Sequence, residues 1–219
     1  MDRTTLSQRI TSILRDIKQV SNTLNAMNMM DVQQYPENYE ALSTDASLRC
    51  EQITCRMRHL VYATTNQSKP SYLEMASEAQ GIKIQVDDGI LTFLLPSVIN
   101  KRSKWKSAEF YLDPFVAALS RYADEHTFPK FKSCVVCFAH IYDRKTAKWA
   151  VRDADNMELK RYLDAVAAYC MTDDNGLLCD SYITAELGDR NYTSITIMEK
   201  RRFPGWINER LSDSEFHLW

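Results

Sequence analysis

The chain has 219 residues, of which 45% are apolar and 26% are charged, and its formal net charge is −2. This length suits one large domain or a domain with an appended helical module, and the apolar share is enough for a sizeable core. A net charge so close to zero excludes binding to nucleic acid by bulk electrostatics, so any such binding requires local basic patches.

The N-terminal third predicts two helices. Apolar residues spaced alternately by four and three form a stripe along the first helix: Leu6, Ile10, Ile13, Ile17, Val20 and Leu24. A second helix is expected over residues 38–63, and the Pro36 region separates the two into a helical hairpin. We interpret the stripe as intramolecular packing, with an oligomerisation or protein-docking role as the alternative.

Residues 66–71 are polar and contain Pro70, which is typical of a linker, and a short helix is expected over residues 72–79. We therefore predict a helical hairpin module at residues 1–70 and a second domain at residues 71–219.

The second domain predicts a mixed α+β fold. Residues 82–86 and 90–95 read as two strands joined by the turn Asp87-Asp88-Gly89. Residues 107–126 have mainly helical spacing, and Pro114 favours a helix that begins near Asp113. The predicted fold is thus α+β, an N-terminal helical hairpin followed by a small mixed sheet with packed helices.

A strand, a helix and a returning strand are expected next. Residues 133–142 are β-branched and aromatic, as in a buried strand, and residues 157–170 carry an amphipathic helical pattern. Asn175-Gly176 is a turn signal before a strand over residues 177–187, and residues 192–198 read as the last strand.

Acidic residues gather around this helix. The segment Asp153-Ala154-Asp155-Asn156 is followed by Lys160, Asp164 and the pair Asp173-Asp174. Hard divalent cations take oxygen ligands and need their charge balanced, so this composition is typical of a metal-dependent phosphodiester site. Asp153 and Asp155, two apart in an extended segment, are expected to point to the same side and to share a metal ion.

The helix is expected to organise these residues. Asp155 or Asn156 is placed as its N-cap, so that Asn156, Lys160 and Asp164 line one stripe beside the apolar face. The returning strand would then bring the two acidic clusters together. The alternative is structural, because an Asp or Asn at a helix start is usually a cap, and Asp-Asp-Asn-Gly is usually a solvated turn.

This order of motifs resembles the RusA-type Holliday junction resolvases, whose pattern is a strand, Asp-x-Asp-Asn, a helical lysine and then Asp-Asp. The segment from Pro96 to Asn100 also resembles the early Pro-Ser-x-x-Asn segment of that family. The resemblance covers residues 82–200. One departure concerns the lysine, which in the family stands three residues after the Asn, where this chain has Leu159 and places Lys160 one residue later.

The resemblance implies a Mg²⁺-dependent endonuclease that works as a homodimer on branched DNA. Asp153, Asp155 and Asp174 would bind the metal with Asp173 alongside, and Lys160 would assist the scissile phosphate. Two basic segments would bind DNA: Asn100, Lys101, Arg102, Lys104, Trp105 and Lys106 in the first, and Lys200, Arg201 and Arg202 in the second, with Asn156 added from the acidic motif.

Other chemistries lack support in the sequence. Cys134 and Cys137 have half of a zinc spacing, but residues three apart on a strand point to opposite faces. The four histidines are dispersed, and no glycine-rich phosphate loop or transmembrane run is present. Scattered cysteines and the lack of an apolar leader indicate a cytoplasmic protein.

Three functions therefore remain in order. The first is a resolvase of Holliday junctions or other branched DNA in recombination and repair. The second is a catalytically inactive relative that binds branched DNA or a protein partner, with the N-terminal helices contributing. The third is a purely protein-interacting domain whose aspartates cap a helix and decorate a turn.

Overall fold

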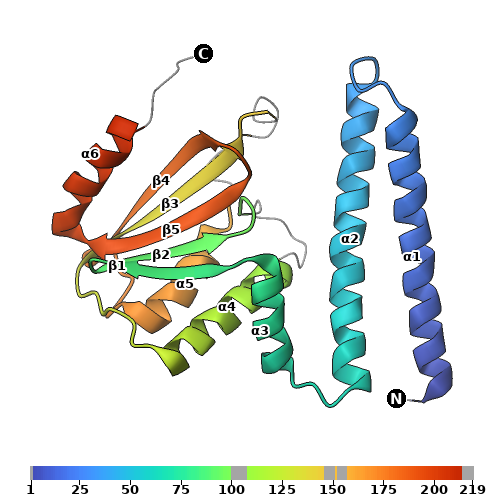
Figure 1. Ribbon diagram of the computed structural model, residues 1–219, viewed down its shortest axis with the longest axis horizontal. Coiled ribbons are helices and arrows are strands. Elements are labelled where there is room, and N and C mark those ends of the chain that lie inside the picture. Colours follow the sequence, from blue (N-terminus) through green and yellow to red (C-terminus); the bar gives the residue numbers. More distant parts are fainter. Residues whose placement is uncertain (1, 100–107, 146–150, 152–156, 214–219) are drawn as a thin grey trace. The chain divides into compact units, whose positions relative to one another are not determined.

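The computed structural model describes residues 2–99, 108–145, 151 and 157–213 (Figure 1). These residues form helices and a five-stranded mixed sheet, so the predicted α+β class is confirmed. The chain divides into two compact units, Met1–Tyr72 and Leu73–Trp219. Among the described helices, none is both long and apolar enough to cross a membrane.

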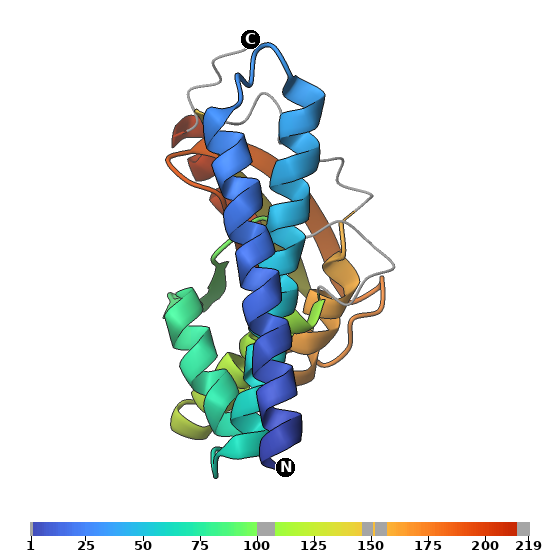
Figure 2. The ribbon, with the colours of Figure 1, turned by 90° about the vertical axis from the view of Figure 1, so that its right-hand side faces the viewer.

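The first unit is built around a helical hairpin of α1 (Arg3–Met29) and α2 (Pro36–Thr64), which run antiparallel (Figure 2). Asp2 caps α1, because its carboxylate accepts a hydrogen bond from the Thr5 N–H at 2.9 Å. Pro36 does not separate the helices but occupies the first turn of α2, where a missing N–H costs nothing.

The expected linker at residues 66–71 is shorter than predicted. Helix α3 (Lys69–Gln80) begins inside it, with Pro70 and Ser71 in the first turn. Ser68 precedes this turn, and its hydroxyl accepts a hydrogen bond from the Ser71 N–H at 3.2 Å. Polar composition and a proline indicated a linker here, but the same residues also suit the start of a helix.

The second unit contains the sheet, in the order β1-β2-β5-β3-β4. Its strands are β1 (Lys83–Asp87), β2 (Ile90–Leu95), β3 (Cys134–Asp143), β4 (Cys179–Gly188) and β5 (Tyr192–Glu199). All neighbours are antiparallel except β3 and β4, which are parallel. The predicted β1–β2 turn is confirmed: Asp88 and Gly89 have φ values of 43° and 73°, as a two-residue hairpin requires.

Helices cover both faces of this sheet (Figure 1). The main core lies on the side of α4 (Ala108–Glu125) and α5 (Leu159–Cys170). On the other side α6 (Phe203–Asp213), which was not predicted, packs Phe203 and Trp206 against a small second cluster. Cys134 belongs to the first cluster and Cys137 to the second, so the prediction that they point to opposite faces is confirmed.

Helix α4 begins at Ala108, earlier than the predicted start near Asp113, and it contains Pro114. Proline has no N–H to donate to the carbonyl four residues earlier, which is that of Phe110. The side chain of Gln80, the last residue of α3, donates to the Phe110 carbonyl at 3.0 Å. A hydrogen bond from another helix therefore replaces the one that Pro114 removes.

Replacing Gln80 with leucine is expected to lower the free energy of unfolding by about 1–3 kcal/mol, because the Phe110 carbonyl is left without this donor. The measurement is urea unfolding of the full chain. Pro114→Ala supplies the matched control, since it restores a backbone donor for Phe110. The loss caused by Gln80→Leu should be smaller in the Pro114→Ala background, and equal losses in both backgrounds would contradict the interpretation.

Helix α5 starts later than predicted. Glu158 is in the N-cap position and Leu159 is the first helical residue, so neither Asp155 nor Asn156 caps the helix. Asn156 consequently does not share a helical stripe with Lys160 and Asp164. Met157 explains the late start, because its side chain is 1% exposed and packs in the main core rather than on a helix face.

Candidate functional site

The C-terminal ends of β2 and β3 lie at the same edge of the sheet. Leu95 and His140 both pair with Thr193 of β5, on opposite sides of that strand. The Thr193 hydroxyl donates to the Ser97 carbonyl at 3.0 Å, accepts from the Ile99 N–H at 3.2 Å and lies 3.2 Å from Nδ1 of His140. These buried contacts fix the points from which the chain continues toward Asn100 and toward Asp153.

This edge is therefore the origin of both segments that carry the predicted motifs. The predicted residues themselves, Asn100, Lys101, Arg102, Lys104, Trp105 and Lys106 in one segment and Asp153, Asp155 and Asn156 in the other, lie outside the described residues. The anchoring by Thr193 and His140 was not anticipated, because it depends on which residues of three strands stand side by side.

Lys160 is the centre of a cluster in the first turn of α5. Its ammonium nitrogen lies 2.8 Å from Asp164 Oδ1 and 3.6 Å from Asp174 Oδ2. The hydrogen bond from Lys160 to Asp164, followed by the negative charges of Asp164 and Asp174, raises the pKa of the lysine. The Asp174 side chain is 32% exposed, the least of the three, while that of Lys160 is 71% exposed.

The contact with Asp174 requires the chain after α5 to turn back. Helix α5 ends beside the start of β3, where the Phe131 N–H donates to the Cys170 carbonyl at 2.8 Å. Strand β4 begins opposite Cys134, so a direct connection would keep the Asp173-Asp174 pair at that end of the helix. The connecting loop instead carries Asp174 to the lysine one residue after the start of the helix.

Asp173 points into its own turn. Its carboxylate accepts hydrogen bonds from the side-chain amide of Asn175 at 2.7 Å and from the Asn175 N–H at 3.3 Å. The hydrogen bond from the Asn175 side chain is the main reason that the pKa of Asp173 is lowered. Asn175 in turn accepts from the Leu177 N–H at 3.0 Å, which completes a compact polar turn.

Magnesium fits these side chains only in part. Carboxylate oxygens of Asp164 and Asp174 are the hard ligands that Mg²⁺ takes. The ammonium of Lys160 lies between them, however, and in the part of the chain that the structure describes no three His, Cys, Asp or Glu side chains are arranged to hold a metal ion. A complete site would need further carboxylates, and Asp153 and Asp155 are the predicted source.

The basic residues after β5 all have acidic partners. Lys200 lies 2.9 Å from Asp180 and also donates to the Leu177 carbonyl. Arg201 pairs with Glu199.

Arg202 donates to both oxygens of Asp88, at 2.7 and 3.3 Å, and this contact lowers the pKa of Asp88. These cations extend from the sheet end opposite to Thr193, because Glu199 pairs with Cys134 at the start of β3. They therefore do not share an edge with the motif segments.

The buried cysteines are not arranged as nucleophiles. Burial raises the pKa of Cys137 to about 12, and burial also raises that of Cys170 to about 12. Cys134 stands opposite Cys179 across β3 and β4, and the hydrogen bond between these thiols raises the pKa of Cys134 and lowers that of Cys179. All six cysteines lie in the described part of the chain, and none is in a disulfide.

A family model described as "Family of unknown function (DUF6100)" matches residues 2–218. The chain belongs to this family. The comparison with curated proteins found no match. Because the DUF6100 model spans both compact units, the helical hairpin is as much a part of the family as the mixed sheet.

Proposed function

We propose that this DUF6100 protein is a Mg²⁺-dependent, structure-selective endodeoxyribonuclease that resembles the RusA-type resolvases. Its substrates are Holliday junctions or other branched DNA in recombination and repair. It acts as a cytoplasmic homodimer, since two like cuts in a four-way junction need two like sites.

The observation that carries the proposal is the contact between Asp174 and Lys160 at 3.6 Å. The loop after α5 brings the second acidic cluster back to the first turn of that helix. Asn156 precedes Lys160 by only four residues, so the Asp-Ala-Asp-Asn segment enters the helix at the same end. Residues far apart in the motif thus converge on one region of the surface.

A second observation supports DNA binding near that region. The basic segment after Ile99 and the acidic segment before Met157 start from one sheet edge, held by Thr193. Lysines and arginines beside an acidic metal site are what a phosphodiester substrate requires, because the metal ligands alone would repel its backbone.

The proposed roles follow from charge and position. Asp153, Asp155 and Asp174 would hold Mg²⁺, which when bound activates a water molecule and stabilises the leaving oxygen. Lys160 would release Asp164 or Asp174 and place its charge against the scissile phosphate. Asp164 would keep the lysine oriented when the phosphate is absent, since the two form an i, i+4 pair on an exposed helix face.

A second candidate is a catalytically inactive relative that binds branched DNA or a protein partner. It is favoured by the ammonium of Lys160, which already occupies the space between two carboxylates, and by Leu159, which packs against the core where the resolvase family has its lysine. The local hydrogen bonds of Asp173 and Asn175 also satisfy a purely structural turn.

The test is cleavage of a labelled synthetic four-way junction with Mg²⁺ or with EDTA, comparing the wild type with Asp155→Asn. We expect symmetric cuts that need Mg²⁺ and are lost in the variant, while a gel-shift assay at low salt shows equal binding. A linear duplex of the same sequence is the control for structure selectivity. Binding without cuts would establish the inactive relative, and the absence of both would reject DNA as the substrate.

A further inference from the structure

The apolar stripe of α1 is only half covered. Ile13 and Val20 are 5% and 8% exposed and pack with Ile53 of α2. The alternate members of the stripe remain in solvent: Ile10 is 41% exposed, Ile17 44% and Leu24 51%, and Leu14 beside them is 59% exposed.

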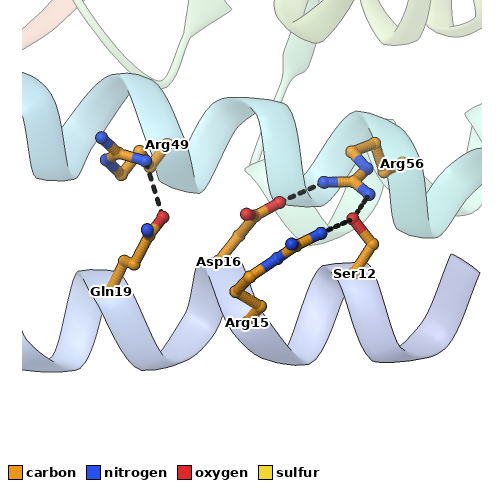
Figure 3. A network of polar contacts seen from close by, with 6 residues as sticks. All are labelled: Ser12, Arg15, Asp16, Gln19, Arg49 and Arg56. Carbon is orange, nitrogen blue, oxygen red and sulfur yellow. Dashed lines mark hydrogen bonds and ion pairs between the residues drawn. The ribbon is translucent and has the colours of Figure 1, made fainter.

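Polar and apolar residues lie on opposite sides of the α1–α2 contact. Ser12 and Asp16 of α1 bind the guanidinium of Arg56 on α2, and Gln19 accepts from Arg49 at 2.9 Å (Figure 3). At 100° per residue, Asp16 and Arg56 each lie about 60° to one side of the buried residues Ile13 and Ile53.

The other side of the same contact is apolar. Ile10 of α1 and Cys50 of α2 lie about 60° from Ile13 and Ile53 in the opposite sense, with Met57 close to Cys50 on the helical wheel. Cys50 is exposed and Met57 is 51% exposed. We call this surface the open face; it consists of Ile10, Leu14, Ile17 and Leu24 from α1 and Cys50 and Met57 from α2.

The spacing on the open face is that of a helix with another helical neighbour. Ile10, Leu14, Ile17, Ser21 and Leu24 are separated by four, three, four and three residues, which is the a/d pattern of a heptad. The buried residues Ile13 and Val20 widen this stripe to the three positions per heptad that helices in a bundle present to a core. A hairpin covers only part of such a stripe.

We propose that the open face binds the same face of a second copy of this chain and that the two hairpins form a four-helix bundle. The open face carries no charged residue between Ile10 and Leu24, so two copies meet without like-charge repulsion. An uncharged, apolar face also gives a charged partner nothing to pair with. Self-association is therefore the contact that this surface fits best.

The size of the surface agrees with a stable dimer. Helix α1 has 27 residues and is about 40 Å long, and two packed helices are about 20 Å wide. The open face thus covers about 800 Å², which is the area that each partner contributes to a standard protein interface. This inference does not depend on nuclease activity, because association is measured without DNA or Mg²⁺.

Sedimentation equilibrium of the full chain tests the proposal. The wild type is expected to have twice the chain mass of 25.4 kDa at micromolar concentration. Leu14→Glu places a carboxylate in the open face and should raise the dimer dissociation constant at least about 100-fold, with Ile17→Glu as a second variant. Leu48→Glu is the matched control, since Leu48 is 50% exposed on α2 but lies outside the open face.

A thiol-specific crosslinker gives an independent readout, because Cys50 lies on the open face. It should join two wild-type chains and should fail with Cys50→Ser. A wild type that stays monomeric at about 100 μM, well above the micromolar range in which a standard-size interface associates, would overturn the proposal, as would a dimer that Leu14→Glu leaves intact. A monomer whose thermal stability falls with Leu14→Glu but not with Leu48→Glu would also overturn it, and would assign the open face to packing within one chain.

Discussion

Asp174→Asn is expected to lower the rate of junction cleavage at least about 100-fold. The amide keeps the size of the carboxylate but lacks its charge, so it binds Mg²⁺ poorly. A catalytic metal supplies several kcal/mol of transition-state stabilisation, and each 1.4 kcal/mol changes the rate about tenfold. The measurement is single-turnover cleavage of the labelled four-way junction at saturating protein.

Asp180→Asn is the matched control for this variant. Asp174 and Asp180 each face one lysine, Lys160 at 3.6 Å and Lys200 at 2.9 Å. Only Asp174 belongs to the resolvase-like motif. Cleavage by Asp180→Asn should stay within about twofold of the wild type, because exposed ion pairs contribute little to stability. Equal losses in both variants would show that Asp174 acts through local structure and not as a metal ligand.

The sequence predicts the elements whose signals are local. Asp88-Gly89 specifies the β1–β2 turn because both residues tolerate positive φ, and the register of the two strands follows from that turn. The opposite faces of Cys134 and Cys137 likewise follow from the alternation of side chains along any strand. These predictions need no knowledge of the rest of the fold.

The errors occur where a distant residue decides the outcome. Pro114 argued for a later start of α4, but Gln80 supplies the hydrogen bond that the proline removes. Asp155 and Asn156 resembled helix caps, but burial of Met157 keeps the chain out of the helix until Leu159. In both places a tertiary contact overrides a correct local preference.

The candidate site was predictable in composition but not in geometry. The residues Lys160, Asp164 and Asp174 are readable from the sequence, whereas the return of the Asp174 loop to the first turn of α5 is not. The partners of Lys200, Arg201 and Arg202 were also hidden, because Asp88 lies more than a hundred residues away from Arg202. Whether a basic run is a free patch depends on such partners.

Phe93→Ala is expected to lower the free energy of unfolding by about 3–5 kcal/mol, the usual cost of deleting a buried aromatic ring. Phe93 on β2 is 0% exposed. Its ring meets that of Phe115 on α4 edge-to-face at 5.5 Å and lies 6.4 Å from that of Phe128. Removing it opens a cavity between the sheet and α4, and the measurement is urea unfolding followed by tryptophan fluorescence and circular dichroism.

Leu177→Ala is the matched control, because Leu177 is 89% exposed and should change the free energy of unfolding by less than about 0.5 kcal/mol. A loss below about 1 kcal/mol in Phe93→Ala would contradict a close-packed core at this position. The pair also separates stability from chemistry. Below its unfolding transition Phe93→Ala should still cut junctions, since its side chain lies inside the core and only Asp174→Asn removes a charge from the proposed metal site.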